Sequence, residues 1–387
     1  MGRIEAASDG VIGRRVAIKT LRQEYRDDER ALLHFTEEAR TTGRLEHPNV
    51  VPIYDLCGVD GANPSIVMRL VVGQTLTQML ADCRPPRPGP ETVDLLQRFV
   101  QIILRVCDAL SFAHSRRIYH CDVKPDNIMV GEHGQVYLMD WGVAVTDQPR
   151  EGFGGTVAYM APEQLLANPG AVDARTDVFL LGGVLFEILT GAAPNEGKAV
   201  LAAARWEGTR NFAPRALWQR LPPELCRIAG KALAREPQAR YQNVAEFRED
   251  LQRFLKGGGW FDTLTARAGE TIVGEGEPGT TAYIIQAGNC DVWKLFQGEP
   301  RLVRRLGPGD VFGETAVFAG GLRTASIVAV GDVTLKVITG DSLNRELDQS
   351  PILAAFVRSL AGLFREADAA LAGGGARIGS TPPPPKP

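Results

Sequence analysis

Hydrophobic residues in the first part of the chain recur with two different periods. Two short apolar runs rich in β-branched residues, 16–19 and 66–72, predict strands. The segments 28–45 and 93–114 have apolar residues at helical spacing, and further helical stretches continue to residue 255. We therefore expect a small sheet-containing part followed by a helical part.

The pattern changes after three consecutive glycines, residues 257–259, which predict a linker. Between residues 263 and 339, short alternating runs separated by Gly-rich turns are typical of a β-barrel or jelly roll. Residues 343–371 are again helical in pattern, and the Gly- and Pro-rich residues after them predict disorder. The pattern thus predicts two domains and a disordered tail, residues 1–256, 257–372 and 373–387.

The overall composition narrows the class of protein. With 44% hydrophobic and 23% charged residues, the chain is typical of globular domains. A formal net charge of -3 gives no general attraction to nucleic acid or to an anionic membrane, although local patches remain compatible with it. No apolar run reaches the ~18 residues of a membrane span, and the longest, 178–189, contains Glu187 and is expected to be a buried helix. Six scattered cysteines without a C-x-x-C pair, and an N-terminus without a signal pattern, predict a cytoplasmic protein without membrane insertion.

Two acidic segments stand out as candidate chemistry. Residues 120–127, HCDVKPDN, bring a carboxylate, an ammonium and an amide close together, and Asp140 follows thirteen residues after Asn127. One acidic loop is usually a surface turn. Two at this spacing, each after an apolar strand-like run, rarely arise by chance.

These segments resemble the protein kinase family, because Asp122, Asn127 and Asp140 follow a strand lysine, Lys19, and a helix glutamate, Glu38. Within the family, the chain is similar to bacterial Ser/Thr kinases of eukaryotic type. The resemblance implies an α+β, bilobal fold for this part of the chain. It also implies ATP and Mg²⁺ as cofactors, and proteins bearing Ser or Thr as substrates.

The resemblance assigns a role to each matching residue. Lys19 would contact the nucleotide phosphates and be aimed by an ion pair with Glu38, while Asp122 would accept the substrate hydroxyl proton. Lys124 would stabilise the transferring phosphoryl group. Asn127 and Asp140 would bind magnesium. Met68, at the back of the pocket, and Leu70, at the hinge, would bind adenine.

The resemblance also implies three structural contacts. Glu163 would pair with Arg240, Trp141 would pack against His120, and Asp177 would start a buried helix that braces the catalytic loop. Taken singly, an exposed helix carboxylate or a solvated lysine at a strand end would be the simpler interpretation of residues such as Glu38 and Lys19.

Two departures from the family pattern change the expectations. The family begins with a G-x-G-x-x-G-x-V loop, of which only Gly2 and Ile4 match, so the N-lobe is truncated at the Gly-rich loop. Either the start lies upstream, which we favour, or nucleotide affinity suffers. Cys121 replaces the arginine that usually precedes the catalytic aspartate, a non-RD pattern without a receptor for a loop phosphate. Since residues 143–155 offer only Thr146 for phosphorylation, we expect activity that loop phosphorylation does not switch.

A second resemblance covers residues 260 to about 370. Residues 312–316, FGETA, and 323–326, RTAS, resemble the phosphate-binding cassette of cyclic-nucleotide-binding domains. The resemblance implies that Arg323 binds the cyclic phosphate and Glu314 the ribose 2′-hydroxyl. A hydroxyl at the position of Thr324 favours guanine in some members of the family. This does not decide between cAMP and cGMP, and both remain open. The alternative is that Glu314 and Arg323 form an internal ion pair in a jelly roll that binds nothing.

Two functions are consistent with these residues. The first is a Ser/Thr protein kinase modulated by cyclic nucleotide. The second is a cyclic-nucleotide-sensing pseudokinase scaffold with little or no catalysis, which the incomplete Gly-rich loop favours. We expect the enzyme, because a scaffold has no need of the complete set Lys19, Glu38, Asp122, Lys124, Asn127 and Asp140.

Overall fold

The computed structural model describes most of the chain. The described residues are 2–58, 64–83, 90–146, 155–165, 172–195, 221–314 and 322–348, with 352, 355–357 and 359–360. They divide into two compact units, Met1–Lys256 and Gly257–Pro387, and each unit is treated by itself.

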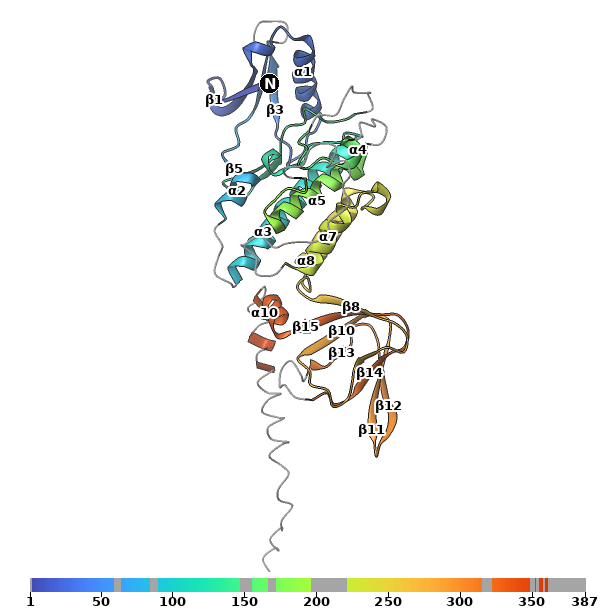
Figure 1. Ribbon diagram of the computed structural model, residues 1–387. Helices are drawn as coiled ribbons and strands as arrows, with labels where there is room; N and C mark the ends of the chain where they lie inside the picture. The colour runs from blue at the N-terminus through green and yellow to red at the C-terminus, as the bar shows by residue number, and fades with distance from the viewer. Residues whose placement is uncertain are drawn as a thin grey trace, which may run out of the picture. The chain divides into compact units, whose positions relative to one another are not determined.

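The first unit opens with a four-stranded antiparallel sheet in the order β1-β2-β4-β3 (Figure 1). Its strands are β1 (Gly2–Asp9), β2 (Arg14–Leu21), β3 (Ile53–Cys57) and β4 (Ser65–Arg69). Helix α1 (Glu29–Gly43) begins at Asp28, whose side chain accepts hydrogen bonds from two backbone N–H groups of the first turn. Phe35 on this helix packs with Leu21 and Ile66 of the sheet in one buried cluster. This packing of α1 onto the sheet fixes the position of Glu38 relative to β2.

The rest of the first unit is mainly helical in its described residues. It contains α2 (Leu76–Asp82), α3 (Pro90–His114), α4 (Pro162–Leu165), α5 (Ala174–Thr190), α7 (Pro223–Ala232) and α8 (Val244–Leu255). Three short strands form a second sheet, β5 (Gly73–Thr75), β6 (Ile128–Gly131) and β7 (Val136–Leu138). Short 3-10 turns lie at Gln23–Tyr25, Pro125–Asn127 and Pro237–Ala239.

Helix α5 is the centre of this helical part. It contacts α3, α7 and α8 (Figure 1). Most of its side chains are buried. A helix that is apolar on all sides needs such a surround. The segment 178–189 is thus a core helix, as predicted. Within the described residues, no helix combines the length and apolar character that crossing a membrane demands.

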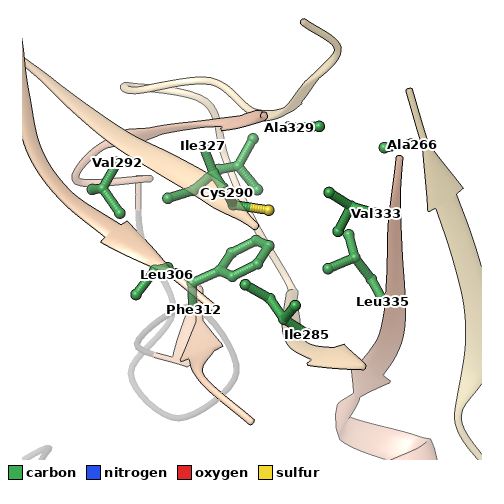
Figure 2. Packing of buried hydrophobic residues seen from close by; sticks show 11 residues of the cluster. Ala266, Ile285, Cys290, Val292, Leu306, Phe312, Ile327, Ala329, Val333 and Leu335 are labelled. Carbon is green, nitrogen blue, oxygen red and sulfur yellow. The ribbon is translucent and has the colours of Figure 1, made fainter. Parts of the chain in front are cut away.

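The described part of the second unit contains two four-stranded antiparallel sheets, followed by helical residues. The sheet orders are β13-β10-β15-β8 and β12-β11-β14-β9. The strands are β8 (Asp262–Ala266), β9 (Thr271–Val273), β10 (Thr281–Ala287), β11 (Cys290–Phe296), β12 (Glu299–Leu306), β13 (Val311–Phe312), β14 (Ser326–Ala329) and β15 (Val333–Thr339). Residues from both sheets, such as Ile285 and Leu335 from one and Val292 and Ile327 from the other, meet in one apolar core (Figure 2).

Helix α10 (Gly340–Asp348) follows the last strand directly. It begins near the start of the predicted helical segment 343–371, most of which lies outside the described residues, as does the predicted tail 373–387. Residues 315–321, in the region of the predicted cassette, also lie outside them.

Candidate active site and anion site

A cavity of about 240 Å³ in the first unit collects several predicted site residues. Lys19, Glu38 and Met68 border it from the sheet and α1, and Asn127 and Asp140 border it from the loops after residue 120. Leu70 is not among the lining residues; it packs with Met68 in a neighbouring apolar cluster. The cavity therefore joins residues from β2, α1, β4 and both acidic segments.

Lys19 and Glu38 form the predicted ion pair. Their Nζ and Oε1 atoms are 2.5 Å apart, and both side chains are largely buried. Burial raises the pKa of Glu38 above its ordinary value, with Asp140 adding to the shift and Lys19 opposing it. A Cβ at Gly2 would lie 2.9 Å from the Cε of Lys19, so a glycine here leaves room for the lysine side chain.

Asp122 lies at the centre of a hydrogen-bonded group beside the cavity. Its Oδ2 accepts from Lys124 at 2.7 Å, and its Oδ1 accepts from the backbone N–H of Thr156 at 2.9 Å. Asn127 donates to the carbonyl oxygen of Asp122 at 2.8 Å and to Oδ2 at 3.1 Å. Lys124 also donates to the hydroxyl of Thr156 at 2.6 Å. These bonds fix the carboxylate in one orientation, with Lys124 and Asn127 next to it.

The backbone before Asp122 is held by Asp177 of α5. Its two carboxylate oxygens each accept at 2.9 Å, from the N–H groups of His120 and Cys121. Cys121 has a φ of +63°, a conformation that costs a non-glycine residue about 1–3 kcal/mol and persists only where neighbours over-determine it. Burial alone would raise the pKa of Asp177, but bonds from His114 and the backbone lower it below its ordinary value. The carboxylate therefore stays ionised and keeps both backbone bonds.

The two other predicted structural contacts are also present. Trp141 and His120 lie with ring centroids 4.6 Å apart. Arg240 donates through both terminal nitrogens to the two carboxylate oxygens of Glu163, at 2.7 and 2.9 Å, and both side chains are buried. A two-bond pair of this geometry is among the stronger charged contacts in proteins.

Several lining residues of the cavity escaped the sequence analysis. They include Thr75, Asp126, Met129 and Met139. Thr75 carried a detectable signal, since T-x-x-Q at 75–78 is a capping box, and the structure shows both of its bonds at the start of α2. The two methionines carried none, because apolar residues next to strands occur throughout a globular chain.

Arg323 in the second unit is held by uncharged oxygen atoms. It donates to the carbonyl oxygen of Thr281 at 2.7 Å, to that of Gly313 at 3.3 Å and to the Thr281 hydroxyl at 3.0 Å. Its guanidinium lies against Gly279, where a Cβ would come within 2.1 Å of Nε. Gly313, with a φ of +74°, approaches it similarly closely. Two glycines and a threonine thus fix the arginine, which the sequence analysis did not anticipate.

Glu314 and Thr324 flank this arginine in sequence but do not bind it. Glu314 is half-buried at the edge of the described segment, and Thr324 is exposed. Across the residues that the structure covers, no carboxylate lies within ion-pair distance of Arg323. The internal Glu314–Arg323 ion pair, the alternative left open by the sequence, is therefore not formed.

Comparison with known proteins gives two family matches. The protein kinase domain matches residues 1–250, and the cyclic nucleotide-binding domain matches residues 263–350. Among curated proteins, the chain is 31% identical over 294 residues to the serine/threonine-protein kinase PknD of Protochlamydia amoebophila, covering 67% of this chain and 29% of that protein. It is 37% identical over 269 residues to the serine/threonine-protein kinase PknB of Mycolicibacterium smegmatis, covering 66% of this chain and 41% of that protein.

The kinase match extends over most of the first unit and well over half of the chain. The matched region spans less than half the length of these curated relatives. The chain belongs to the family of bacterial Ser/Thr protein kinases, with a cyclic nucleotide-binding domain following the kinase domain.

Proposed function

We propose that the chain transfers the γ-phosphate of ATP to Ser or Thr hydroxyls of proteins, and that a cyclic nucleotide bound to the second unit modulates the transfer. The observation that carries the first part is the convergence of Lys19, Asn127 and Asp140 on one cavity beside Asp122. Six separate side chains with matching roles are more than a scaffold requires.

The residues around the cavity fit a magnesium–nucleotide ligand. Asp140 and Asn127 supply oxygen atoms of the kind that Mg²⁺ prefers, and magnesium commonly binds to one or two such groups together with substrate phosphates. Because Nδ2 of Asn127 donates to Asp122, its Oδ1 remains for the metal. When bound, ATP supplies the phosphoryl group and Mg²⁺ neutralises its charge.

The chain's own residues then divide the remaining work. Glu38 keeps the Nζ of Lys19 directed into the cavity, toward the phosphates. Asp122 orients the substrate hydroxyl and accepts its proton, while Lys124 compensates charge on the transferring group. Positioning and electrostatic stabilisation of this kind account for most of the catalysis in phosphoryl transfer.

The kinase is of the non-RD type in this proposal. Cys121 occupies the position before Asp122, and its buried thiol provides no cation for a phosphate on the activation segment. Asp177 and Gln164 already hold its backbone, the latter by a bond of 2.8 Å to the carbonyl oxygen. The catalytic loop is thus ordered without a phosphorylated partner.

The test of the kinase is transfer from labelled ATP to a generic Ser/Thr acceptor by the chain with Mg²⁺. Transfer that Asp140→Ala abolishes supports the proposal, because that carboxylate is expected to hold the metal. A chain that binds ATP but transfers no phosphate would indicate the alternative, a pseudokinase scaffold.

The second part of the proposal rests on Arg323. Thr281 and Gly313 orient its guanidinium, and no described carboxylate neutralises it, which favours an anion such as a cyclic phosphate. Glu314 is placed one residue after Gly313, from where it would accept from the ribose hydroxyl. The base, adenine or guanine, is decided by titrating cAMP and cGMP side by side.

We expect cyclic nucleotide to change the transfer rate roughly 5- to 150-fold, the usual range of coupling between two sites. Isothermal titration calorimetry measures binding, and the labelled-ATP assay measures the response. Arg323→Ala should lose both binding and response while basal transfer persists. Equal nucleotide affinity in the wild type and in this variant would overturn the sensor assignment.

A further inference from the structure

Glu346 of α10 binds the segment that connects the second unit to α8. Its Oε2 accepts from the backbone N–H of Gly258, and its Oε1 accepts from that of Trp260, both at 2.8 Å. Gly257 and Gly258 have φ values of +106° and +82°, which only glycine adopts readily. The linker glycines thus allow the chain to turn so that two N–H groups converge on one carboxylate, an arrangement typical of anion-binding backbone turns.

The same contact holds Trp260 in the interior. Trp260 is 3% exposed, and the guanidinium carbon of Arg345 lies 5.4 Å from the centroid of its ring. Its Nε1–H is buried and has no acceptor among the described residues. A buried donor without a partner disfavours the state that contains it. A modest change in free energy could therefore shift the linker from the state held by Glu346 to a released state.

A continuous series of contacts connects the Arg323 site to this helix. Arg323 donates to the carbonyl and the hydroxyl of Thr281 on β10. Thr281 lies opposite Thr339, the last residue of β15, in the antiparallel pairing of the two strands. Thr339 and Ser342 exchange hydrogen bonds of 2.8 to 3.1 Å that fix the start of α10. Glu346 lies on the same helix, so contacts through β10, β15 and α10 lead from the Arg323 site to the linker.

We propose that Glu346 transmits occupancy of the Arg323 site to the kinase domain by holding or releasing the linker. An anion bound by Arg323 competes with Thr281 for the guanidinium N–H groups, and this alters the start of β10 and with it the start of α10. The carboxylate of Glu346 then loses its alignment with Gly258 and Trp260. Lys256, which caps α8, is covalently joined to this linker. This inference rests on the proposed binding of cyclic nucleotide at Arg323.

The test uses the full chain and three variants. Glu346→Ala removes both acceptors, and Glu346→Gln keeps one acceptor oxygen and the shape of the side chain. Asp341→Ala removes an exposed carboxylate from the same helix and serves as the matched control. For each protein we would measure the affinity for cAMP and cGMP, labelled-phosphate transfer with and without nucleotide, and hydrogen exchange of the amides of Gly258 and Trp260.

We expect Glu346→Ala to bind nucleotide within about twofold of the wild type but to transfer phosphate at one rate with or without it. Its two linker amides should exchange at least about tenfold faster, since exchange follows local opening. Glu346→Gln should be intermediate, and Asp341→Ala should respond as the wild type does. In the wild type, nucleotide should accelerate exchange of the same two amides.

The outcomes separate this inference from the sensor proposal. A wild type that responds to nucleotide, with a Glu346→Ala variant that responds equally, would overturn the role of Glu346 and leave the sensor intact. Absence of nucleotide binding in the wild type would contradict the sensor proposal itself. Unchanged exchange at Gly258 and Trp260 in Glu346→Ala would contradict the hold on the linker, whether or not nucleotide binds.

Discussion

The lysines at the cavity of the first unit and Arg323 of the second unit differ in what surrounds them. In the first unit, Lys19 pairs with Glu38 and Lys124 pairs with Asp122. In the second unit, Arg323 donates to the uncharged oxygens of Thr281 and Gly313. Carboxylates neutralise the first site, whereas within the described residues the partners of Arg323 are uncharged dipoles.

This difference matches the two kinds of phosphate that the sites are proposed to bind. ATP arrives with its own magnesium ions, so a cavity with paired lysines and free oxygen ligands suits it. A cyclic phosphate is a bare monoanion and needs an uncompensated charge. Carbonyl dipoles hold a guanidinium in place without cancelling its charge. The guanidinium therefore still attracts an anion strongly at short range. Both sites contain a cation. They differ in whether a carboxylate balances its charge.

Among the substitutions at the kinase site, Asp122→Asn is expected to have the largest effect on phosphate transfer. We expect transfer to fall roughly 10²- to 10⁴-fold, the range attributed to a positioned general base. The amide keeps the shape of the side chain, so thermal unfolding should change little. Labelled-phosphate transfer and a melting curve measure both effects. Glu132→Gln, at an exposed position, is the control, and near-normal transfer by Asp122→Asn would remove that residue from the mechanism.

Gly279→Ala tests the orientation of Arg323. A Cβ at this position would lie 2.1 Å from Nε, so the guanidinium must leave its place. We expect a roughly 10- to 100-fold loss of cyclic-nucleotide affinity, the cost of about one or two charged hydrogen bonds. Calorimetry against Gly331→Ala, where the added methyl group meets open space, provides the comparison. Equal affinity of Gly279→Ala and Gly331→Ala for cyclic nucleotide would contradict this role of Gly279.

Glu38→Gln separates activity from stability in the neutralised site. Transfer should fall about tenfold because Lys19 loses its ionic partner. The free energy of unfolding should not fall, since the raised pKa of Glu38 means that its ionised form is disfavoured in the fold even beside Lys19. Glu37→Gln, an exposed neighbour on α1, is the matched control.

The pH dependence of the same residue follows from its raised pKa. The folded chain binds this proton more readily than the unfolded chain, so falling pH stabilises the fold at this group. Phosphate transfer should instead decrease as the pH falls, because protonation of Glu38 removes the negative charge that orients Lys19. The acid limb of the pH–rate profile should therefore change in Glu38→Gln, and an identical limb in both proteins would assign it to another group.

Thr146→Ala should have the smallest effect. With Cys121 before the catalytic aspartate, no arginine is present there to receive a loop phosphate. We expect transfer within about twofold of the wild type. The same assay before and after phosphatase treatment extends the test to other residues. A tenfold loss in Thr146→Ala would show that the loop is switched by phosphorylation after all.

The sequence predicted the elements and the contacts whose residue types and order identify a family. Lys19, Trp141 and Arg240 each met the partner that the resemblance implied. These contacts were predictable because a protein kinase needs them in the same order along the chain. The change from helical to strand periodicity after residue 256 was visible for a simpler reason, since alternation and helical spacing have different periods.

Contacts between segments without a shared pattern were not predictable. Thr281 and Arg323 are 42 positions apart, and Gly258 and Glu346 are 88 apart. Nothing in the types of Thr281 or Glu346 distinguishes them from other threonines and exposed glutamates. Strand register brought the first pair together, and the helix following β15 brought the second.

The sequence by itself determined which chemical groups the chain carries and the order of its helices and strands, because local periodicity and residue type depend on neighbours along the chain. Only the tertiary structure decided that carboxylates neutralise Lys19 and Lys124, that uncharged oxygens hold Arg323 in the described part of the chain, and that Glu346 holds the linker. The physical reason is distance: charge compensation acts over a few ångströms in space, between groups that lie far apart along the chain.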